Sequence, residues 1–178
     1  AEGFTLDLAG DGLLALDVTR QVAAAPSGAA ALVTQSGVIE AEGGHVLLTA
    51  RAASGLLETL VEAGGRIAAP DGVIEVTAPG GGVRAPAGAL LDTAGAAEGG
   101  RVTLGAGARS TPGAPQRLSA RSTVARDATL RAGSGGSVIV HAEERTAMHG
   151  AVEAEAGAIE VSSRGALALD GALRAPGG

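Results

Sequence analysis

The stretch Ile39-Glu40-Ala41-Glu42-Gly43-Gly44-His45-Val46-Leu47-Leu48 contains the pattern that decides the fold of this chain. In its second half a glycine is followed by aliphatic residues two and four positions later. The pattern begins again at Gly72, Gly100, Gly136 and Gly157, so successive glycines are separated by 28, 28, 36 and 21 residues. The two aliphatic positions are constant in character, whereas the residue between them varies in polarity. This alternation has the period of a β-strand with one buried face.

The first half of the stretch predicts a second short strand before each copy. An aliphatic residue, a mostly polar residue and a small residue follow one another at 39–41, 67–69, 91–93, 130–132, 152–154 and 173–175. A glycine-rich turn such as Pro70-Asp71-Gly72 then leads into the glycine pattern, where glycine can supply a positive φ. Each repeat therefore contains two short strands around a tight corner, plus a variable third segment.

Short strands that recur every 20–30 residues, and that cannot bury their own faces, predict an all-β fold: a parallel β-solenoid over residues 1–178. Looser copies at 12–16 and 165–169 raise the expected number of coils to seven or eight, a rod about 35 Å long at the spacing of paired strands. Val102 is expected to face the core, and Thr103 to face solvent. Further coils are expected beyond both ends, so the chain is expected to be a fragment of a longer repetitive protein.

The composition agrees with a thin aliphatic core and excludes several functions. The 178 residues include 30 glycines, one phenylalanine, and no tryptophan, tyrosine or cysteine. Without cysteine there is no disulfide, thiolate zinc site or cysteine nucleophile. A net charge of −6 and the lack of aromatic stacking residues disfavour nucleic-acid binding. No apolar run is long enough to be a transmembrane segment.

Two alternatives compete with the solenoid. Residues 52–63 have the composition of a short helix, which a solenoid can carry at a corner. A disordered Ala/Gly-rich chain is the other alternative, but disorder does not place β-branched residues at fixed distances after glycine.

Residues 36–53 resemble a recurring stretch of filamentous-haemagglutinin-type exoproteins, the large adhesins of bacterial two-partner secretion. The opening Phe4-Thr5-Leu6-Asp7-Leu8-Ala9-Gly10-Asp11-Gly12-Leu13 resembles segments near the end of their secretion domain, and the resemblance extends over about residues 1–76. It implies a right-handed parallel β-helix, export through an outer-membrane two-partner transporter, and an extracellular or cell-surface location on a Gram-negative bacterium. The chain has no asparagine and so lacks the Asn-Pro motifs of that secretion domain.

The sequence predicts no catalytic, cofactor-binding or metal site, and no cofactor. His45, His141 and His149 are expected at strand edges and corners, and Glu143-Glu144-Arg145 is expected to be a solvated loop. The glycine triplet 80–82 lacks the lysine of a phosphate loop and is expected to be a turn.

The function predicted is that of a structural or adhesive, non-enzymatic segment of a surface exoprotein. Its expected partners are the transporter, host-cell or matrix glycans, and other copies in a fibre. A polysaccharide-active enzyme on a parallel β-helix and the passenger of an autotransporter are the alternatives.

One outer face is expected to carry an alternating charge ladder. Arg131, Glu153 and Arg174 follow the core aliphatic in three successive repeats, so in-register coils would place them about 4.8 Å apart.

Overall fold

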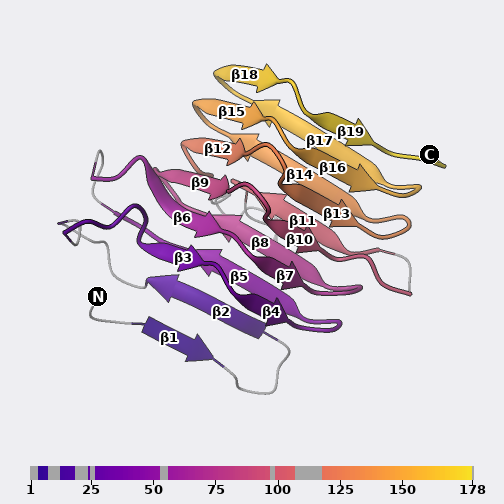
Figure 1. The fold of residues 1–178 in the computed structure, drawn as a ribbon, viewed down its shortest axis with the longest axis horizontal. Helices are drawn as coiled ribbons and strands as arrows, with labels where there is room; N and C mark the ends of the chain where they lie inside the picture. Colours follow the sequence, from indigo (N-terminus) through magenta and orange to yellow (C-terminus); the bar gives the residue numbers. More distant parts are fainter. Residues whose placement is uncertain are drawn as a thin grey trace, which may run out of the picture.

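The chain winds into a three-sided parallel β-solenoid (Figure 1). The computed structural model describes the backbone of residues 4–7 and 13–18, and residues 24, 27–52, 56–96, 99–106 and 118–177 in full. Within these ranges every regular element is a β-strand. The predicted all-β solenoid is therefore confirmed.

Three sheets run along the rod, one for each side. Sheet A contains β1 (Phe4–Asp7), β2 (Leu13–Val18), β5 (His45–Thr49), β8 (Val73–Thr77), β11 (Arg101–Leu104), β14 (Ser137–Ala142) and β17 (Ala158–Ser163). Sheet B contains β3 (Val33–Gln35), β6 (Thr59–Ala63), β9 (Gly82–Ala85), β12 (Arg121–Val124), β15 (Arg145–Met148) and β18 (Ala166–Leu169). Sheet C contains β4 (Val38–Glu40), β7 (Arg66–Ala68), β10 (Leu90–Asp92), β13 (Thr129–Ala132), β16 (Ala151–Ala154) and β19 (Ala172–Arg174).

The chain visits sheets A, B and C in turn, and each strand pairs in parallel with the strand one coil away. The exception is β1, which lies antiparallel to β2 at the outer edge of sheet A. The solenoid makes about five turns, fewer than the seven or eight coils expected. The main reason is that the glycine pattern at 165–169 is β18 in sheet B, and so is not a further coil of sheet A.

Equivalent positions of the glycine pattern pair with one another on neighbouring strands of sheet A. Val46 lies beside Ile74, Ile74 beside Val102, Val102 beside Val138, and Val138 beside Ile159. Coils of 28, 28, 36 and 21 residues therefore bring equivalent positions together, because extra residues are taken up outside the paired strands. A slip of one residue would turn every aliphatic side chain outward.

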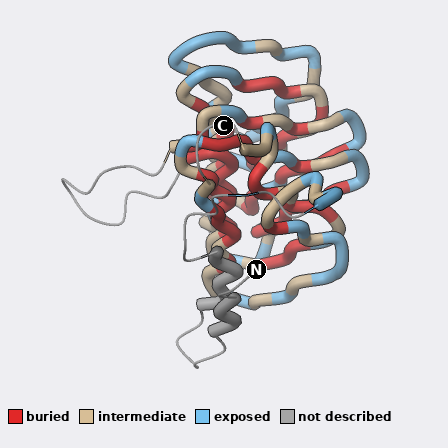
Figure 2. The backbone as a smooth tube through the Cα atoms, turned by 90° about the vertical axis from the view of Figure 1, so that its left-hand side faces the viewer, coloured by how far each residue is buried: buried red, intermediate tan, exposed pale blue. Residues whose placement is uncertain are grey.

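The core is a narrow column of aliphatic ladders. Figure 2 shows buried residues in successive coils along the rod. Its fully buried members in sheets A and C are Val46, Leu48, Ile74, Val76, Val102, Leu104, Val138, Val140, Ile67, Leu91, Leu130 and Val152. Burying each such side chain contributes about 1.5–3 kcal/mol to folding before the entropy cost. Ile159 and Val161, in the last coil, are only partly buried.

Sheet B is formed by the third segment of each repeat, whose sequence varies from copy to copy. Its inward row reads Val61, Val83, Ser122, Thr146 and Leu167, so polar residues interrupt the aliphatic pattern. Ser122 Oγ donates to the carbonyl of His141 at 2.7 Å, and Thr146 Oγ1 donates to the carbonyl of Ser162 at 2.7 Å. These bonds satisfy hydroxyls that face the core.

The helix considered for residues 52–63 is wrong for the second half of that range, which is a strand. Thr59–Ala63 forms β6, which pairs with β3 and β9. Burial of Leu60, Val61 and Ala63 outweighs the local helix propensity. Residues 53–55 of that alternative lie outside the described residues.

The glycines of the repeat corners have two roles. Gly43, Gly100 and Gly135 have the positive φ that was expected, whereas Gly72 does not. At the Pro70-Asp71-Gly72 corner it is Asp71 that has the positive φ, at 60°. A Cβ on Gly72 would lie 2.1 Å from the carbonyl oxygen of Gly44, in the coil below. The glycine is therefore required because stacked corner backbones approach too closely for a side chain.

The outer face of sheet A is not solvated around β8 and β11. Thr103 points outward, as its place in the strand requires, yet it is only 1% exposed, and Glu75 is 6% exposed. Thr103 lies between Glu75 and Ile139 in one outer row. The Thr103 side chain therefore points away from the core, as expected, but it is buried, whereas exposure to solvent was expected.

Candidate functional site: polar clusters on the outer faces

The most regular polar feature is the charge ladder on the outer face of sheet C. Arg131 pairs in register with Glu153, and Glu153 with Arg174, as the sequence predicted. Arg174 Nη1 lies 3.0 Å from Glu153 Oε1. The structure extends the ladder by one residue, because Asp92 lies one coil before Arg131. Asp92 occupies the same place in its repeat, directly after Leu91, so the repeat alignment already contained this signal.

Asp92 and Arg131 form the tightest pair of the ladder. The Arg131 guanidinium donates from Nε to Asp92 Oδ1 at 3.0 Å and from Nη2 to Oδ2 at 2.6 Å. The backbone N–H of Ala94 also donates to Asp92 Oδ1, at 3.0 Å. The Asp92 side chain is 6% exposed, whereas that of Arg131 is 46% exposed. This bidentate geometry anchors the ladder.

The pKa of Asp92 reflects opposing effects. Burial by itself raises the pKa of this carboxyl. The hydrogen bonds from Arg131 and Ala94, with the charges of Arg131 and Arg66, outweigh burial and hold the pKa below its ordinary value. The hydrogen bond to Asp92 is also the main cause that raises the pKa of Arg131 above its ordinary value. The pair is therefore fully ionised at neutral pH.

His45 lies beside a buried carboxylate. Its Nε2 is 3.8 Å from Glu75 Oε2, on the outer face of sheet A. The sequence predicted a solvated edge for His45, but the residue is only partly exposed. The pair lies next to Thr103, whose hydroxyl has no hydrogen-bond partner among the described residues.

His141, Ser162 and Glu160 form a second cluster on sheet A, nearer the carboxy-terminal end. His141 Nδ1 is 2.8 Å from Ser162 Oγ, and Ser162 Oγ donates to Glu160 Oε1 at 2.6 Å. The serine therefore stands between the imidazole and the carboxylate. A Ser–His–acid triad needs the imidazole in the middle, so that it can take the serine proton while the acid orients it. In this order Glu160 does not orient the imidazole, so the three residues do not form such a triad.

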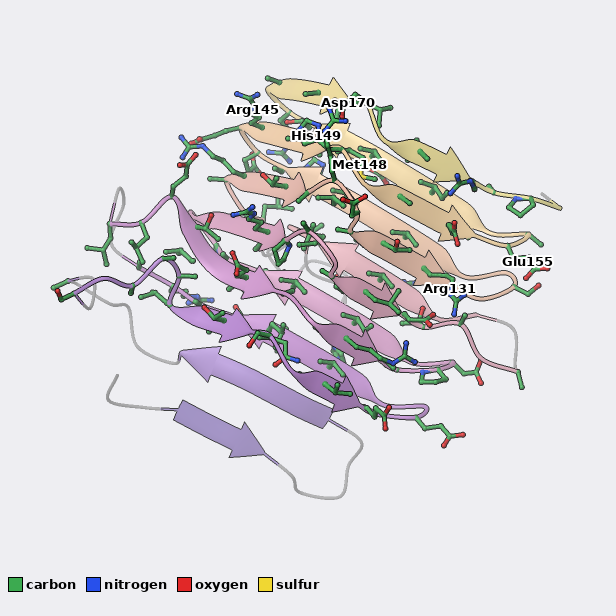
Figure 3. All side chains as sticks on the ribbon, in the orientation of Figure 1. Arg131, Arg145, Met148, His149, Glu155 and Asp170 are labelled. Atoms are coloured by element: carbon green, nitrogen blue, oxygen red, sulfur yellow. The ribbon has the colours of Figure 1, made fainter. Side chains whose placement is uncertain are left out.

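His149 and Asp170 meet at the corner between sheets B and C (Figure 3). Nδ1 of His149 is hydrogen-bonded to Oδ1 of Asp170, and Arg126 Nη2 lies 3.1 Å from Oδ2. The hydrogen bond from His149 holds the pKa of Asp170 below its ordinary value, and the charges of His149 and Arg126 act in the same direction. The three residues come from three different coils, so they join the corners along the rod.

Two adjoining hollows lie at the corner between sheets A and B and on the outer face of sheet B. They measure about 380 and 360 Å³ and share Glu58 and Arg121. Gly80, Gly81 and Gly82 line the first, and Arg145 lines the second. The glycine triplet thus forms a turn into β9 and leaves space beside two arginines that are paired in register, Arg121 and Arg145.

The two acids of Glu143-Glu144-Arg145 form ion pairs with arginines from two different coils. Glu143 Oε2 lies 3.2 Å from Arg164 Nη1, and Glu144 Oε2 lies 3.5 Å from Arg121 Nη2. Glu143 and Glu144 form the short corner between β14 and β15, as predicted, whereas Arg145 is the first residue of β15. The two glutamates therefore pair with the coils on either side and do not form a common acidic site.

No group of three or more His, Asp or Glu side chains in the described part of the chain is arranged to hold a metal ion. The described segments also contain no helix with the length and apolar character needed to cross a membrane. Comparison with known proteins found no matching family model, no matching curated protein and no matching solved structure.

Proposed function

We propose that the chain is a structural, adhesive segment of a large secreted bacterial exoprotein, in which the solenoid acts as a rod that presents its outer faces to other molecules. The observation that carries this proposal is the unbroken register of sheet A from β2 to β17, over a core of aliphatic side chains. A stacked rod of this kind offers long polar surfaces at a fixed spacing of about 4.8 Å.

The polar clusters support a binding rod better than an enzyme. The ladder residues of sheet C are paired with one another, the His141–Ser162–Glu160 cluster does not have the order of a Ser–His–acid triad, and His149 is hydrogen-bonded to Asp170. These groups hold coils together, which is a structural role. The partners of the segment are the outer-membrane transporter during export and, at the cell surface, matrix or host-cell glycans or other copies of the protein.

The secretion context is tested by the neighbouring gene. A two-partner system requires an adjacent outer-membrane transporter gene, whereas an autotransporter carries a membrane barrel in the same polypeptide. Expression of the full-length protein with and without that neighbour should release it into the medium only when the neighbour is present. Release without any partner would contradict the proposal.

A polysaccharide-active enzyme is the second candidate, and the hollows at Glu58 and Arg121 favour it, since acids and arginines face a common space there. The purified chain should be incubated with acidic and neutral polysaccharides while reducing ends and unsaturated uronates are measured. The structural proposal expects no product. Product that disappears in Glu58→Gln and persists in a Glu42→Gln control, a change at an exposed corner, would establish the enzyme instead.

Adhesion itself is measured by immobilising the purified chain and adding matrix proteins or glycan-coated particles. A binding face on sheet B predicts that Arg121→Ala with Arg145→Ala weakens capture. Arg66→Ala with Arg101→Ala, which removes two exposed arginines on sheets C and A, is the matched control. Equal loss in both variants would show that capture depends on net charge and not on this face.

A further inference from the structure

Arg121 and Arg145 lie side by side on the outer face of sheet B. Each is the first residue of its strand, β12 or β15, and the parallel register places one directly opposite the other. Along the paired strands of the described residues, this is the one position where two side chains of like charge are opposite each other. Like charges in this arrangement lower stability. The arginine pair therefore does not serve to hold the coils together, unlike the charge ladder of sheet C.

The protein neutralises this pair only in part. Arg121 Nη2 lies 3.5 Å from Glu144 Oε2, and both side chains are about half exposed. Arg145 is exposed and forms no ion pair with the residues that the structure describes. Each guanidinium therefore has N–H groups that are available to an added anion.

The two arginines line one hollow of about 360 Å³, together with Glu58, Thr123 and Ala147. Thr123 and Ala147 are paired in register in the neighbouring outer row, so their small side chains leave space beside the arginines. Glu58 is exposed, just before β6, and forms no ion pair with the described residues. The hollow thus combines two cationic donors with a carboxylate acceptor.

Gly82 keeps the adjoining hollow open. It lies opposite Arg121 in the coil before, and a Cβ at this position would be 2.2 Å from the carbonyl oxygen of Glu58. No side chain can therefore occupy the outer row there. The adjoining hollow of about 380 Å³ shares Glu58 and Arg121 with the first, so the two form a continuous surface for an extended ligand.

We propose that this surface binds an acidic polysaccharide built of uronate units, each with one carboxylate and several hydroxyl groups. The inference rests on the proposed adhesive function, because it names the ligand class of the rod. The Arg121 and Arg145 guanidiniums would bind uronate carboxylates through paired hydrogen bonds. The Glu58 carboxylate would accept hydrogen bonds from sugar hydroxyls. Glu58 and Glu144 also repel additional negative charge, so a densely sulfated glycan fits this surface less well.

Isothermal titration calorimetry of the purified chain with a galacturonate tetrasaccharide, at pH 7 and low salt, tests the proposal. We expect the chain to bind, and Arg145→Gln to bind about tenfold more weakly, because a charge-assisted hydrogen bond is lost. Arg101→Gln is the matched control, since it removes an exposed arginine on sheet A with the same change of net charge. Equal weakening in the two variants, or no binding by the unaltered chain, would overturn the proposal.

Two further ligands identify the chemical class. The same tetrasaccharide with its carboxylates reduced to alcohols should not bind, since the arginines then have no anion to pair with. A heparin tetrasaccharide should bind more weakly than galacturonate, and Glu58→Gln should narrow this difference by removing a repelling carboxylate. Binding of the reduced sugar, or tighter binding of heparin to the unaltered chain, would overturn the proposal.

A thermal melt separates binding from folding. Arg145→Gln should leave the melting temperature unchanged or raise it, because it removes the repulsion from Arg121. A lower melting temperature would show that Arg145 serves the fold, and would contradict the proposal.

The outcomes also distinguish this site from the adhesive function as a whole. Capture of glycan-coated particles without binding of the galacturonate tetrasaccharide would overturn the site and leave the adhesive role standing. Binding of the tetrasaccharide that depends on Arg145, with no capture of particles, would support the site and contradict the adhesive role.

Discussion

Arg131 lies one coil beyond Asp92 on the outer face of sheet C and binds both oxygens of its carboxylate, at 3.0 and 2.6 Å. The register of the two strands places the side chains opposite one another. Because Asp92 is almost fully buried and Arg131 is half exposed, the arginine also shields the acid from water. This pair shows how the solenoid turns a recurring sequence position into a specific contact.

The Asp92 pair makes stability depend on pH in acid. The pKa of Asp92 is lowered in the folded protein, so the unfolded chain binds its proton first as the pH falls. The stabilisation is therefore complete above the unfolded pKa of about 4, and is lost as the pH falls through the lower folded pKa. Urea unfolding should show that Asp92→Asn costs more at pH 7 than at pH 2.5. An equal cost at both values would mean that the ion pair contributes nothing.

Val138 tests the register of the core. Val138→Asp would place an unpaired charge between Val102 and Ile159, and should destabilise by several kcal/mol. Ser137→Asp is the matched control, because Ser137 faces outward beside the exposed Arg101 and should change stability by less than about 0.5 kcal/mol. Thermal melts of the two variants give the comparison. A lower melting temperature for Ser137→Asp than for Val138→Asp would show that the assigned faces are reversed, and similar melting temperatures would contradict the assignment.

Glu153 tests the charge ladder. It lies between Arg131 and Arg174, so Glu153→Gln removes two attractions, and Glu153→Arg replaces them with two repulsions. Each exposed pair is worth about 0.2–1 kcal/mol, and Glu153→Arg should therefore cost clearly more than Glu153→Gln. At 1 M NaCl the difference in unfolding free energy should largely disappear, since the Debye length falls to about 3 Å. A difference that does not respond to salt would point to packing as its cause.

Thr103 tests the buried outer face of sheet A. Its hydroxyl is buried without a hydrogen-bond partner among the described residues, so Thr103→Val should leave stability unchanged or raise it by up to about 1 kcal/mol. Thr103→Asp should destabilise strongly, because a second carboxylate would be buried beside Glu75. Chemical denaturation of both variants measures the two effects. A tolerated aspartate would mean that this face is open to water in solution.

The aliphatic ladders were predictable because their signal is local. Alternation after each repeat glycine identifies a strand with one buried side, and equal spacing identifies positions that can stack. Arg131, Glu153 and Arg174 followed from the same alignment without any knowledge of distances. Sheet B was missed because its inward row mixes Ser122 and Thr146 with aliphatics, which weakens the alternation that marks a strand.

The sequence by itself determined that the chain is a β-solenoid and which residues of sheets A and C face its core, since both depend on periodicity along one strand. Only the tertiary structure decided the burial of the outward-facing Thr103 and Glu75. It alone also showed how His141, Ser162 and Glu160 are ordered, and that Asp170 joins His149 and Arg126. These properties depend on which side chains lie above and below one another and on how closely they pack. Residues that are 21 or 44 positions apart in the chain become neighbours only when the coils stack.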